Sequence, residues 1–182
     1  MVNTLEIATL AGGCFWCLEA IFENVRGVSR VESGYCGGHV QRPSYEEVCS
    51  ETTGHAESIQ VTFDRHVVSY EDLLTVFFVI HNPTTLNYQG YDVGSRYRSV
   101  IFYSTPEQES VAKNTIAKLE EDTVWNSTIV TEVKPLTEFY PAEDYHQQYY
   151  KKNTDQPYCQ IIIAPKLSKF LKEHLDKLKP LV

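Results

Sequence analysis

The sequence has 182 residues, of which 42% are hydrophobic and 22% are charged, and its formal net charge is −8. This length suits one domain, spanning residues 1–182, with a sizeable core. The acidic balance argues against nucleic acid or an anionic membrane surface as the main partner. The longest apolar run, LLTVFFVI, is well short of the roughly 20 residues that span a bilayer. Because the start also lacks a basic segment followed by an apolar run, we expect a soluble, cytoplasmic protein.

The hydrophobic pattern of the first third predicts alternating elements. Residues 4–11 form a strand, and a helix follows, in which Leu18, Ile21, Phe22 and Val25 share one face. Residues 28–38 form a strand that runs into a glycine turn, and residues 44–49 form a short helix. Residues 56–64 alternate as a half-buried strand does.

The remaining elements predict a mixed order. The segment from Ser69 to Pro83 is interpreted as a helix capped by Ser69, with Pro83 beyond its end; a strand is the competing interpretation, because VFFVI is apolar throughout. Residues 99–103 form a strand, and residues 105–121 form a helix with a capping box from Thr105 to Gln108 and Pro106 in its first position. Residues 129–133 and 159–164 are strands in this reading, and an amphipathic helix with Leu167 and Phe170 ends the chain. This order favours an α+β domain, a sheet with helices packed on it, over a doubly wound parallel sheet.

Five cysteines occur in the chain. An odd count without a secretory signal favours a reactive thiol over a structural disulfide framework. Cys14 and Cys17 have CxxC spacing, but the sequence offers no second CxxC or HxxxH partner, so we predict no metal site.

Cys14 is the first candidate nucleophile, since it follows Gly12 and Gly13 at the junction of a predicted strand and helix. A thiol attacks only as a thiolate, and a helix N-terminus stabilises that charge. The glycines allow the backbone to approach a substrate closely. The competing interpretation is an inert, buried cysteine.

Phe15, Trp16 and Glu57 extend this hypothesis. The two rings either pack in the core or form the wall of an apolar pocket. Glu57 shares a strand face with Ile59 and Val61, so burial would keep it protonated and able to donate a proton. Alternatively, Glu57 lies at a solvated strand end or pairs with an arginine.

The segment PAEDYHQQYYKKNTDQPYC carries three further candidates. If it is helical, His146 and Tyr149 share a face. Cys159 lies in a stretch of polar and turn-forming residues, where it could move; it could equally be a free surface thiol. A hydrolytic pair of Cys14 and His146 lacks any surrounding hydrolase motif.

Several segments resemble one known family in their order along the chain, from about residue 8 to residue 163. They are GCFWCLEA, GYCGG, PSYEEVCSETTGHAE, DVGSRYRSVIFY and AEDYHQQYYKKN. Together they resemble the A-type peptide methionine sulfoxide reductases. The resemblance implies a two-layer α+β sandwich with a mixed sheet and a ferredoxin-like core. It also implies reduction of methionine-S-sulfoxide, free or in proteins, in the repair of oxidative damage.

The resemblance assigns roles to residues by matching motifs. It makes Cys14 the nucleophile and Glu57 the acid that protonates the sulfoxide oxygen. The others are the methyl-binding Phe15 and Trp16, the oxygen-binding Tyr45 and Tyr97, the polar pocket residue Asp92, the supporting residues His146 and Tyr149, and the resolving cysteine, Cys159.

The sequence departs from the family pattern at three positions. Cys17 replaces the usual glycine, Arg96 a glutamine and Cys36 a common threonine. Cys17 is an alternative resolving thiol, but we favour Cys159, because a disulfide inside a continuing helix would be strained. Cys36 and Cys49 are interpreted as structural, or as a late relay.

The mechanism implied by the resemblance passes through a sulfenic acid on Cys14 and then a disulfide. An external dithiol, thioredoxin by resemblance, reduces that disulfide. We expect a monomer with no metal and no bound cofactor. The main alternative is a general thiol-disulfide oxidoreductase that uses Cys14 and Cys17, in which Glu57 and Tyr97 would have no role. A non-enzymatic redox or metal-binding module is a further alternative.

Overall fold

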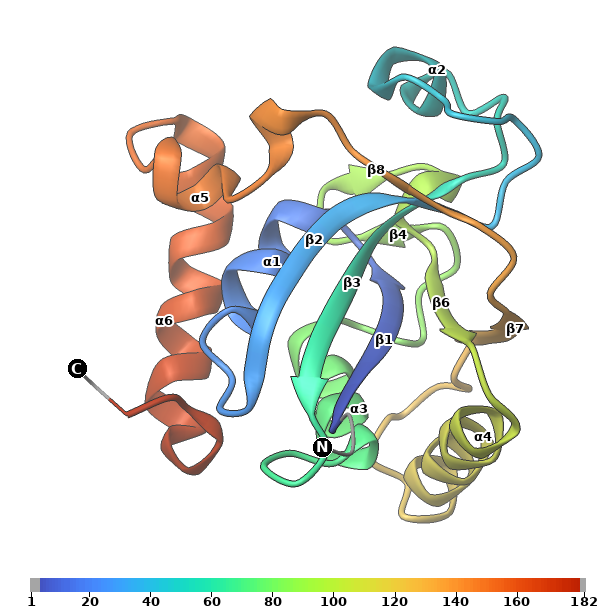
Figure 1. The fold of residues 1–182 in the computed structure, drawn as a ribbon, viewed down its shortest axis with the longest axis vertical. Helices are drawn as coiled ribbons and strands as arrows, with labels where there is room; N and C mark the ends of the chain where they lie inside the picture. The colour runs from blue at the N-terminus through green and yellow to red at the C-terminus, as the bar shows by residue number, and fades with distance from the viewer. Residues whose placement is uncertain (1–3, 181–182) are drawn as a thin grey trace.

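The computed structural model describes residues 4–180. Within this range six strands form one curved sheet, and a separate two-stranded hairpin lies beside it (Figure 1). The sheet strands are β1 (Leu5–Gly12), β2 (Val28–Cys36), β3 (Ala56–Asp64), β6 (Ser99–Tyr103), β7 (Glu132–Pro135) and β8 (Phe139–Pro141). The hairpin strands are β4 (Tyr88–Gln89) and β5 (Asp92–Val93).

Helices pack against this sheet, and Figure 1 shows α1 and α3 behind it, with α6 alongside α1. The α-helices are α1 (Phe15–Phe22), α2 (Tyr45–Cys49), α3 (Tyr70–Ile80), α4 (Pro106–Glu121), α5 (Tyr149–Lys152) and α6 (Ala164–Glu173). Short 3-10 helices are η1 (Ser95–Tyr97), η2 (Asp144–His146) and η4 (Leu175–Lys177), and η3 (Cys159–Ile163) is a π-helix.

The sheet has the spatial order β7-β6-β1-β3-β2-β8. All neighbouring pairs are antiparallel except β6 and β7, which run parallel. Along the chain, the four central strands and two helices follow the order β1-α1-β2-β3-α3-β6, a β-α-β-β-α-β pattern. In the sheet, β3 lies between β1 and β2, and β1 lies between β3 and β6. This is an arrangement of split β-α-β units. The predicted α+β class, with a mixed sheet and packed helices, is confirmed.

The core lies between the sheet and the helices, and β3 shows why the chain folds this way. Ile59, Val61 and Phe63 alternate along the strand and are fully buried on the helix side of the sheet. Phe22 from α1 and Phe77 from α3 are buried in the same cluster. Because Glu57 has the same parity as these residues, the strand directs its carboxyl toward the helices as well.

The helix starts follow their capping residues. The side chain of Ser69 accepts from the backbone N–H of Asp72 at the start of α3, and Thr105 accepts from that of Gln108 at the start of α4. The side chain of Gln108 accepts from Ser104 rather than from Thr105. The predicted capping box at the start of α4 is therefore wrong in one half: Thr105 caps the helix, but the Gln108 side chain binds the N–H of Ser104 instead of that of Thr105.

The predicted strand over residues 159–164 is wrong. Cys159 and Ile163 are both fully buried, whereas Ile161 between them is 69% exposed. A spacing of four residues buries one side of a helix, and packing against α1 overrides the strand preference of the isoleucines. The segment therefore forms η3 and continues directly into α6.

The strand predicted over residues 129–133 begins later, since β7 covers Glu132–Pro135. Before it, the N–H of Val130 donates to the carbonyl of Pro83, and the hydroxyls of Thr131 and Ser99 lie 2.8 Å apart. These loop contacts occupy the groups that a strand would need. In the part of the chain that the structure describes, no helix is both long and apolar enough to cross a bilayer.

Candidate active site

Cys14 lies where β1 turns into α1. β1 ends at Gly12, Gly13 adopts a φ of 101°, and Cys14 is the extended N-cap residue of the helix, with φ −60° and ψ 125°. A positive φ strains any residue with a Cβ, which explains the glycine at this turn. Cys14 is 7% exposed, so its side chain is almost fully enclosed by neighbouring residues.

Glu57 reaches the same helix start from β3. Its side chain is 2% exposed, and its Oε2 accepts a 3.1 Å hydrogen bond from the backbone N–H of Phe15. Burial, and secondly the neighbouring charge of a Cys14 thiolate, hold the pKa of Glu57 well above its usual range. The carboxyl is thus neutral near pH 7, and because Oε2 is an acceptor the proton resides on Oε1.

The electrostatics of Cys14 differ from the sequence expectation of a thiolate at rest. Burial, and secondly a hydrogen bond to Cys17, raise the pKa of Cys14. The same hydrogen bond lowers the pKa of Cys17 and outweighs its burial. Burial therefore favours the protonated thiol at Cys14 in the free protein.

Four aromatic side chains form a wall beside Cys14. The rings of Trp16 and Tyr149 are stacked, with centroids 3.7 Å apart and planes at 7°. The indole Nε1–H of Trp16 donates to Nδ1 of His146 at 3.1 Å, and Phe15 lies 5.1 Å from the His146 ring. The ring of Trp16 is therefore fixed both by stacking and by a hydrogen bond.

His146 is neutral in this arrangement. Burial lowers its pKa, and an Nδ1 that accepts from Trp16 leaves the proton on Nε2. Nε2 lies 3.8 Å from Oε2 of Glu143. The predicted helix through His146 and Tyr149 is interrupted, because Gln148 between them has a φ of 55°; both residues nevertheless contact Trp16.

Tyr45 and Tyr97 bring two hydroxyls toward Glu57. Burial, and secondly the charge of an ionised Glu57, raise the pKa of both phenols, so both remain protonated donors. The Arg96 guanidinium lies over the Tyr97 ring at 4.5 Å, and the Tyr45 ring packs edge-on against His146 at 4.4 Å. The charge of Glu57 acts on both phenols, and that of a Cys14 thiolate acts on Tyr97, while the Tyr45 hydroxyl also interacts with the Cys49 side chain.

Asp92 approaches from the β4–β5 hairpin. Its Oδ2 accepts a 2.7 Å hydrogen bond from the hydroxyl of Tyr158, which also lies 4.0 Å from Sγ of Cys17. Tyr158 thus connects the pocket carboxylate to the pair of thiols. Its place in the sequence, directly before Cys159, gave no indication of this contact.

Sequence reasoning also missed Tyr35 and Glu143. The Tyr35 hydroxyl donates to Oε2 of Glu143 at 2.7 Å, and the N–H of Tyr45 donates to the other carboxylate oxygen at 2.8 Å. Partial burial acts to raise the pKa of Glu143, but these hydrogen bonds lower it overall. In the sheet Tyr35 pairs with Glu57 across β2 and β3, a register that the sequence alone does not show.

Comparison with known proteins identifies the family. A sequence model described as peptide methionine sulfoxide reductase matches residues 6–179. The chain belongs to this family. MsrA of Saccharolobus solfataricus is 51% identical over 175 residues, which are 96% of this chain and 98% of the relative. MsrA of Deinococcus radiodurans is 52% identical, covering 96% of this chain and 84% of the relative.

Solved structures of this family share the fold. Reduced Mxr1 from Saccharomyces cerevisiae has a TM-score of 0.79 and 31% identity, with 87% of this chain and 91% of Mxr1 covered. Methionine sulfoxide reductase A of Corynebacterium diphtheriae has a TM-score of 0.74 and 33% identity, with 83% and 76% covered. Mxr1 has also been solved in complex with Trx2, a structure with a TM-score of 0.57 and 23% identity to this chain, with 82% and 87% covered.

The cysteines of this methionine sulfoxide reductase are all free. Cys17 interacts directly with the Cys14 thiol, whereas Cys159 is fully buried in η3. Burial, and secondly the charge of a Cys14 thiolate, raise the pKa of Cys159. Cys36 is buried and donates to the carbonyl of Glu138 at 3.2 Å, and Cys49 is half-buried in α2. Among the described residues no cluster of metal-ligating side chains occurs.

Proposed function

We propose that this reductase converts methionine-S-sulfoxide, free or in oxidised proteins, to methionine by direct attack of Cys14 on the sulfur. The observation that carries the proposal is the neutral Glu57 carboxyl held 3.1 Å from the N–H of Phe15, the residue after Cys14. A thiol and a proton donor side by side are the two groups that removal of a sulfoxide oxygen requires.

In the chemical step the Cys14 sulfur attacks the sulfoxide sulfur, and the thiol proton passes to Glu57 to replace the one that its carboxyl gives to the sulfoxide oxygen. The sulfoxide oxygen takes the proton from Oε1 of Glu57 and is held by the hydroxyls of Tyr45 and Tyr97. The oxygen's bond to the methionine sulfur breaks, and the protonated oxygen passes to the Cys14 sulfur. Methionine leaves and Cys14 becomes a sulfenic acid, so Cys14 is oxidised by the two electrons that the substrate gains. Without the proton the leaving oxygen would be strongly basic, and general acid help of about 10²–10⁴-fold is expected.

The substrate's methyl group fits against Phe15 and Trp16, whose ring faces exclude water from the reacting sulfur. Stereochemistry follows from this arrangement. With the methyl against the rings and the oxygen toward Glu57, the remaining chain of the S epimer extends outward, while the R epimer would exchange two of these positions. His146 and Tyr149 fix the wall, and Asp92 provides polar contact at the pocket's edge.

We propose Cys17 as the first partner of the sulfenic acid and Cys159 as the second. The sequence argument against Cys17 was strain inside a helix, but Cys14 is the extended N-cap residue, so a bond from N-cap to N3 spares the helical turns. Cys17 gives its sulfur to the disulfide and water leaves. Once η3 has moved to expose it, Cys159 attacks the Cys17 sulfur of that disulfide, which forms a Cys17–Cys159 disulfide and releases the Cys14 thiolate.

We propose that thioredoxin reduces the enzyme disulfide, and that this takes place in the cytoplasm. The proposed reaction uses no metal and no bound organic cofactor, and the protein is expected to act as a monomer. The support is chemical, since a disulfide of this kind is reduced by exchange with an external dithiol. The yeast relative Mxr1 in complex with Trx2 is consistent with the same partner.

The decisive test is an assay of methionine-S- and methionine-R-sulfoxide with dithiothreitol, and then with thioredoxin, thioredoxin reductase and NADPH. Reduction of the S epimer alone, with both reductants, is the expected result. Equal rates on the two epimers would exclude the proposed pocket geometry. Activity with dithiothreitol but none with thioredoxin would exclude the proposed partner.

A further inference from the structure

Glu19 is a buried carboxyl that the chemistry above does not use. It lies on α1, one turn after Phe15 and Trp16, and is 1% exposed. Its Oε2 accepts a 3.2 Å hydrogen bond from the backbone N–H of Tyr149. Its Oε1 makes no hydrogen bond of ordinary geometry within residues 4–180; the nearby Ser33 hydroxyl, which also lacks such a bond, stabilises the carboxylate charge. A buried oxygen without such a bond lowers stability, so this carboxyl requires an explanation beyond packing.

The segment that Glu19 holds has a strained backbone. Gln148 adopts φ 55° and ψ 38°, a left-handed conformation that is unfavourable for a residue with a side chain. A left-handed residue followed by a right-handed one turns successive backbone N–H groups toward one point, where an anion binds. The Tyr149 N–H meets the Glu19 carboxylate there, and the amide of Gln148 also stabilises its charge.

This contact lies directly behind the substrate wall. The Tyr149 residue whose N–H binds Glu19 is the one whose ring stacks on Trp16 at 3.7 Å. Glu19 and Trp16 both belong to α1, so the carboxylate connects the two sides of the stack: the helix that carries Trp16 and the backbone that carries Tyr149.

The electrostatic balance shows that Glu19 does not maximise stability. Burial, and to a smaller degree repulsion from Glu23, raises the pKa of Glu19 to about 7 against opposing hydrogen bonds from Gln148, Tyr149 and the Ser33 side chain. Lys151 of α5 pairs with Glu23. A charge that reduces stability and does not touch the substrate points to a use in function.

We propose that Glu19 is a positioning residue, whose carboxylate holds the backbone at Gln148 and Tyr149 and thereby seats the Tyr149 ring on Trp16. This inference rests on the proposed function insofar as Trp16 forms the wall for the substrate's methyl group. Glu19 does not contact the reacting atoms. Without the Glu19 carboxyl, the Tyr149 ring is no longer held against Trp16 and the substrate wall is less rigid. Binding of the substrate and of the transition state should therefore weaken by the same amount.

The first test compares Glu19→Gln and Glu19→Ala with wild-type enzyme, using methionine-S-sulfoxide and dithiothreitol. Glu19→Ala should raise KM about tenfold with kcat nearly unchanged, the pattern of lost uniform binding. Glu19→Gln keeps one acceptor oxygen for the Tyr149 N–H and should lie between Glu19→Ala and wild type. Thermal unfolding of each variant verifies that it is folded. If Glu19→Ala does not fold, the KM comparison is made with Glu19→Gln alone.

The matched control is Glu23→Gln. Glu23 is the residue that caps the C-terminal end of α1, one turn after Glu19, and it pairs with Lys151 of α5 at 3.0 Å. The Glu23→Gln variant therefore removes an ion pair between the same two helices and leaves the backbone at Gln148 and Tyr149 unchanged. An ion pair near the surface contributes little, so the KM of Glu23→Gln should match wild type.

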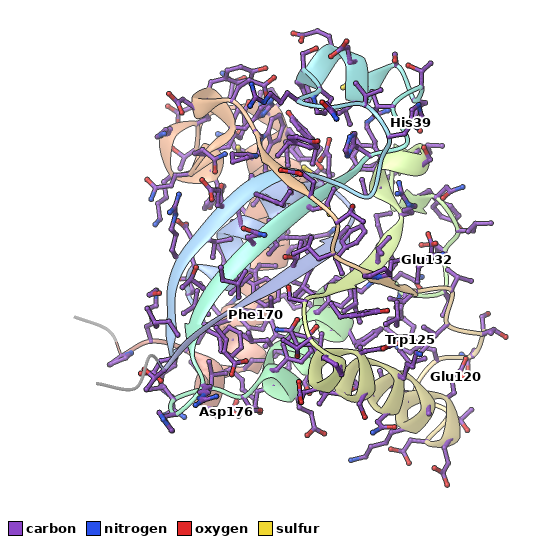
Figure 2. All side chains as sticks on the ribbon, turned by 45° about the vertical axis from the view of Figure 1, so that its right-hand side comes forward. His39, Glu120, Trp125, Glu132, Phe170 and Asp176 are labelled. Carbon is purple, nitrogen blue, oxygen red and sulfur yellow. The ribbon has the colours of Figure 1, made fainter. Side chains whose placement is uncertain are left out.

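The second readout does not depend on activity. The chain has two tryptophans, Trp16 and Trp125, and Trp125 lies beside α4, far from α5 (Figures 1 and 2). In a Trp125→Phe background, Glu19→Ala should shift the emission of Trp16 to longer wavelength and change its near-ultraviolet circular dichroism, since the Tyr149 ring leaves its face.

A double-mutant cycle separates positioning from a general structural role. If Glu19 acts through Tyr149, then Glu19→Ala added to Tyr149→Ala should change KM by less than about twofold. A full tenfold increase in that background would overturn the proposal. So would unchanged KM and unchanged Trp16 emission in both Glu19 variants. If wild-type enzyme reduced no sulfoxide, the proposed function would fail, while the emission of Trp16 would still decide whether Glu19 seats Tyr149.

Discussion

The backbone N–H of Phe15 donates to Oε2 of Glu57 across 42 residues of sequence. This bond fixes which carboxyl oxygen is an acceptor and leaves the proton of Glu57 on the other. It also joins the acid to the first residue of α1, directly after Cys14. The nucleophile and the acid are therefore positioned by one helix start, and a shift of that helix moves both.

Glu57→Gln should lower the rate of a single turnover by about 10²–10⁴-fold with little change in KM. The amide keeps an acceptor oxygen for the Phe15 N–H but carries no acidic proton. Rapid quench of methionine formation measures the step directly. Glu107→Gln, an exposed carboxyl at the start of α4, is the matched control. A single-turnover rate within threefold of wild type would exclude Glu57 as the acid.

The order of the two resolving cysteines gives a second prediction. With thioredoxin, Cys17→Ser should accumulate the sulfenic acid on Cys14, because its nearest partner is gone, and dimedone should label Cys14 within one turnover. Cys159→Ser should instead accumulate a Cys14–Cys17 disulfide. Mass spectrometry after alkylation of free thiols distinguishes these species. A Cys14–Cys159 disulfide that forms at the wild-type rate in Cys17→Ser would assign the first step to Cys159.

Tyr158→Phe tests the contact between Asp92 and the thiols. The Tyr158 hydroxyl lowers the pKa of both Cys14 and Cys17, and it also occupies Oδ2 of Asp92. Its removal should raise the pKa of both thiols, so the pH profile of iodoacetamide alkylation should move to higher pH. Mapping of the alkylated sites by mass spectrometry follows each sulfur. An unchanged profile at both cysteines would show that this hydroxyl does not affect the thiols.

Much of the site follows from local pattern, because strand parity and helix caps are local properties. The alternation of β3 predicts that Glu57 is buried, and the glycine turn predicts that Cys14 begins a helix. The Tyr35–Glu143 hydrogen bond joins residues 108 positions apart, which no local pattern encodes. The raised pKa of Cys14 was missed for the same reason, since burial depends on how β3, α1 and the hairpin close over one sulfur.

The strand wrongly predicted over residues 159–164 shows the limit of propensity. Three consecutive isoleucines favour a strand when the sequence is taken alone. In the fold, only Ile163 of the three is fully buried, together with Cys159 one turn earlier. Which residues of an apolar run face the core depends on the element against which they pack, and here that element is α1.

Glu19 gives the last prediction, for stability against pH. Its pKa is near 4.5 when unfolded and about 7 when folded, so the folded state prefers the neutral form. Protonation of Glu19 therefore adds fully to the free energy of unfolding below pH 4.5. This contribution, roughly 3 kcal/mol, is lost as the pH rises toward 7. Glu57 changes stability in the same direction, so the quantity to measure is the difference between wild type and Glu19→Gln. Urea unfolding is measured at pH 5 and at pH 8, with reductant present. The free energy of unfolding of Glu19→Gln, relative to that of wild type, should be higher at pH 8 than at pH 5. A difference that is the same at both pH values would mean that Glu19 ionises normally in the fold.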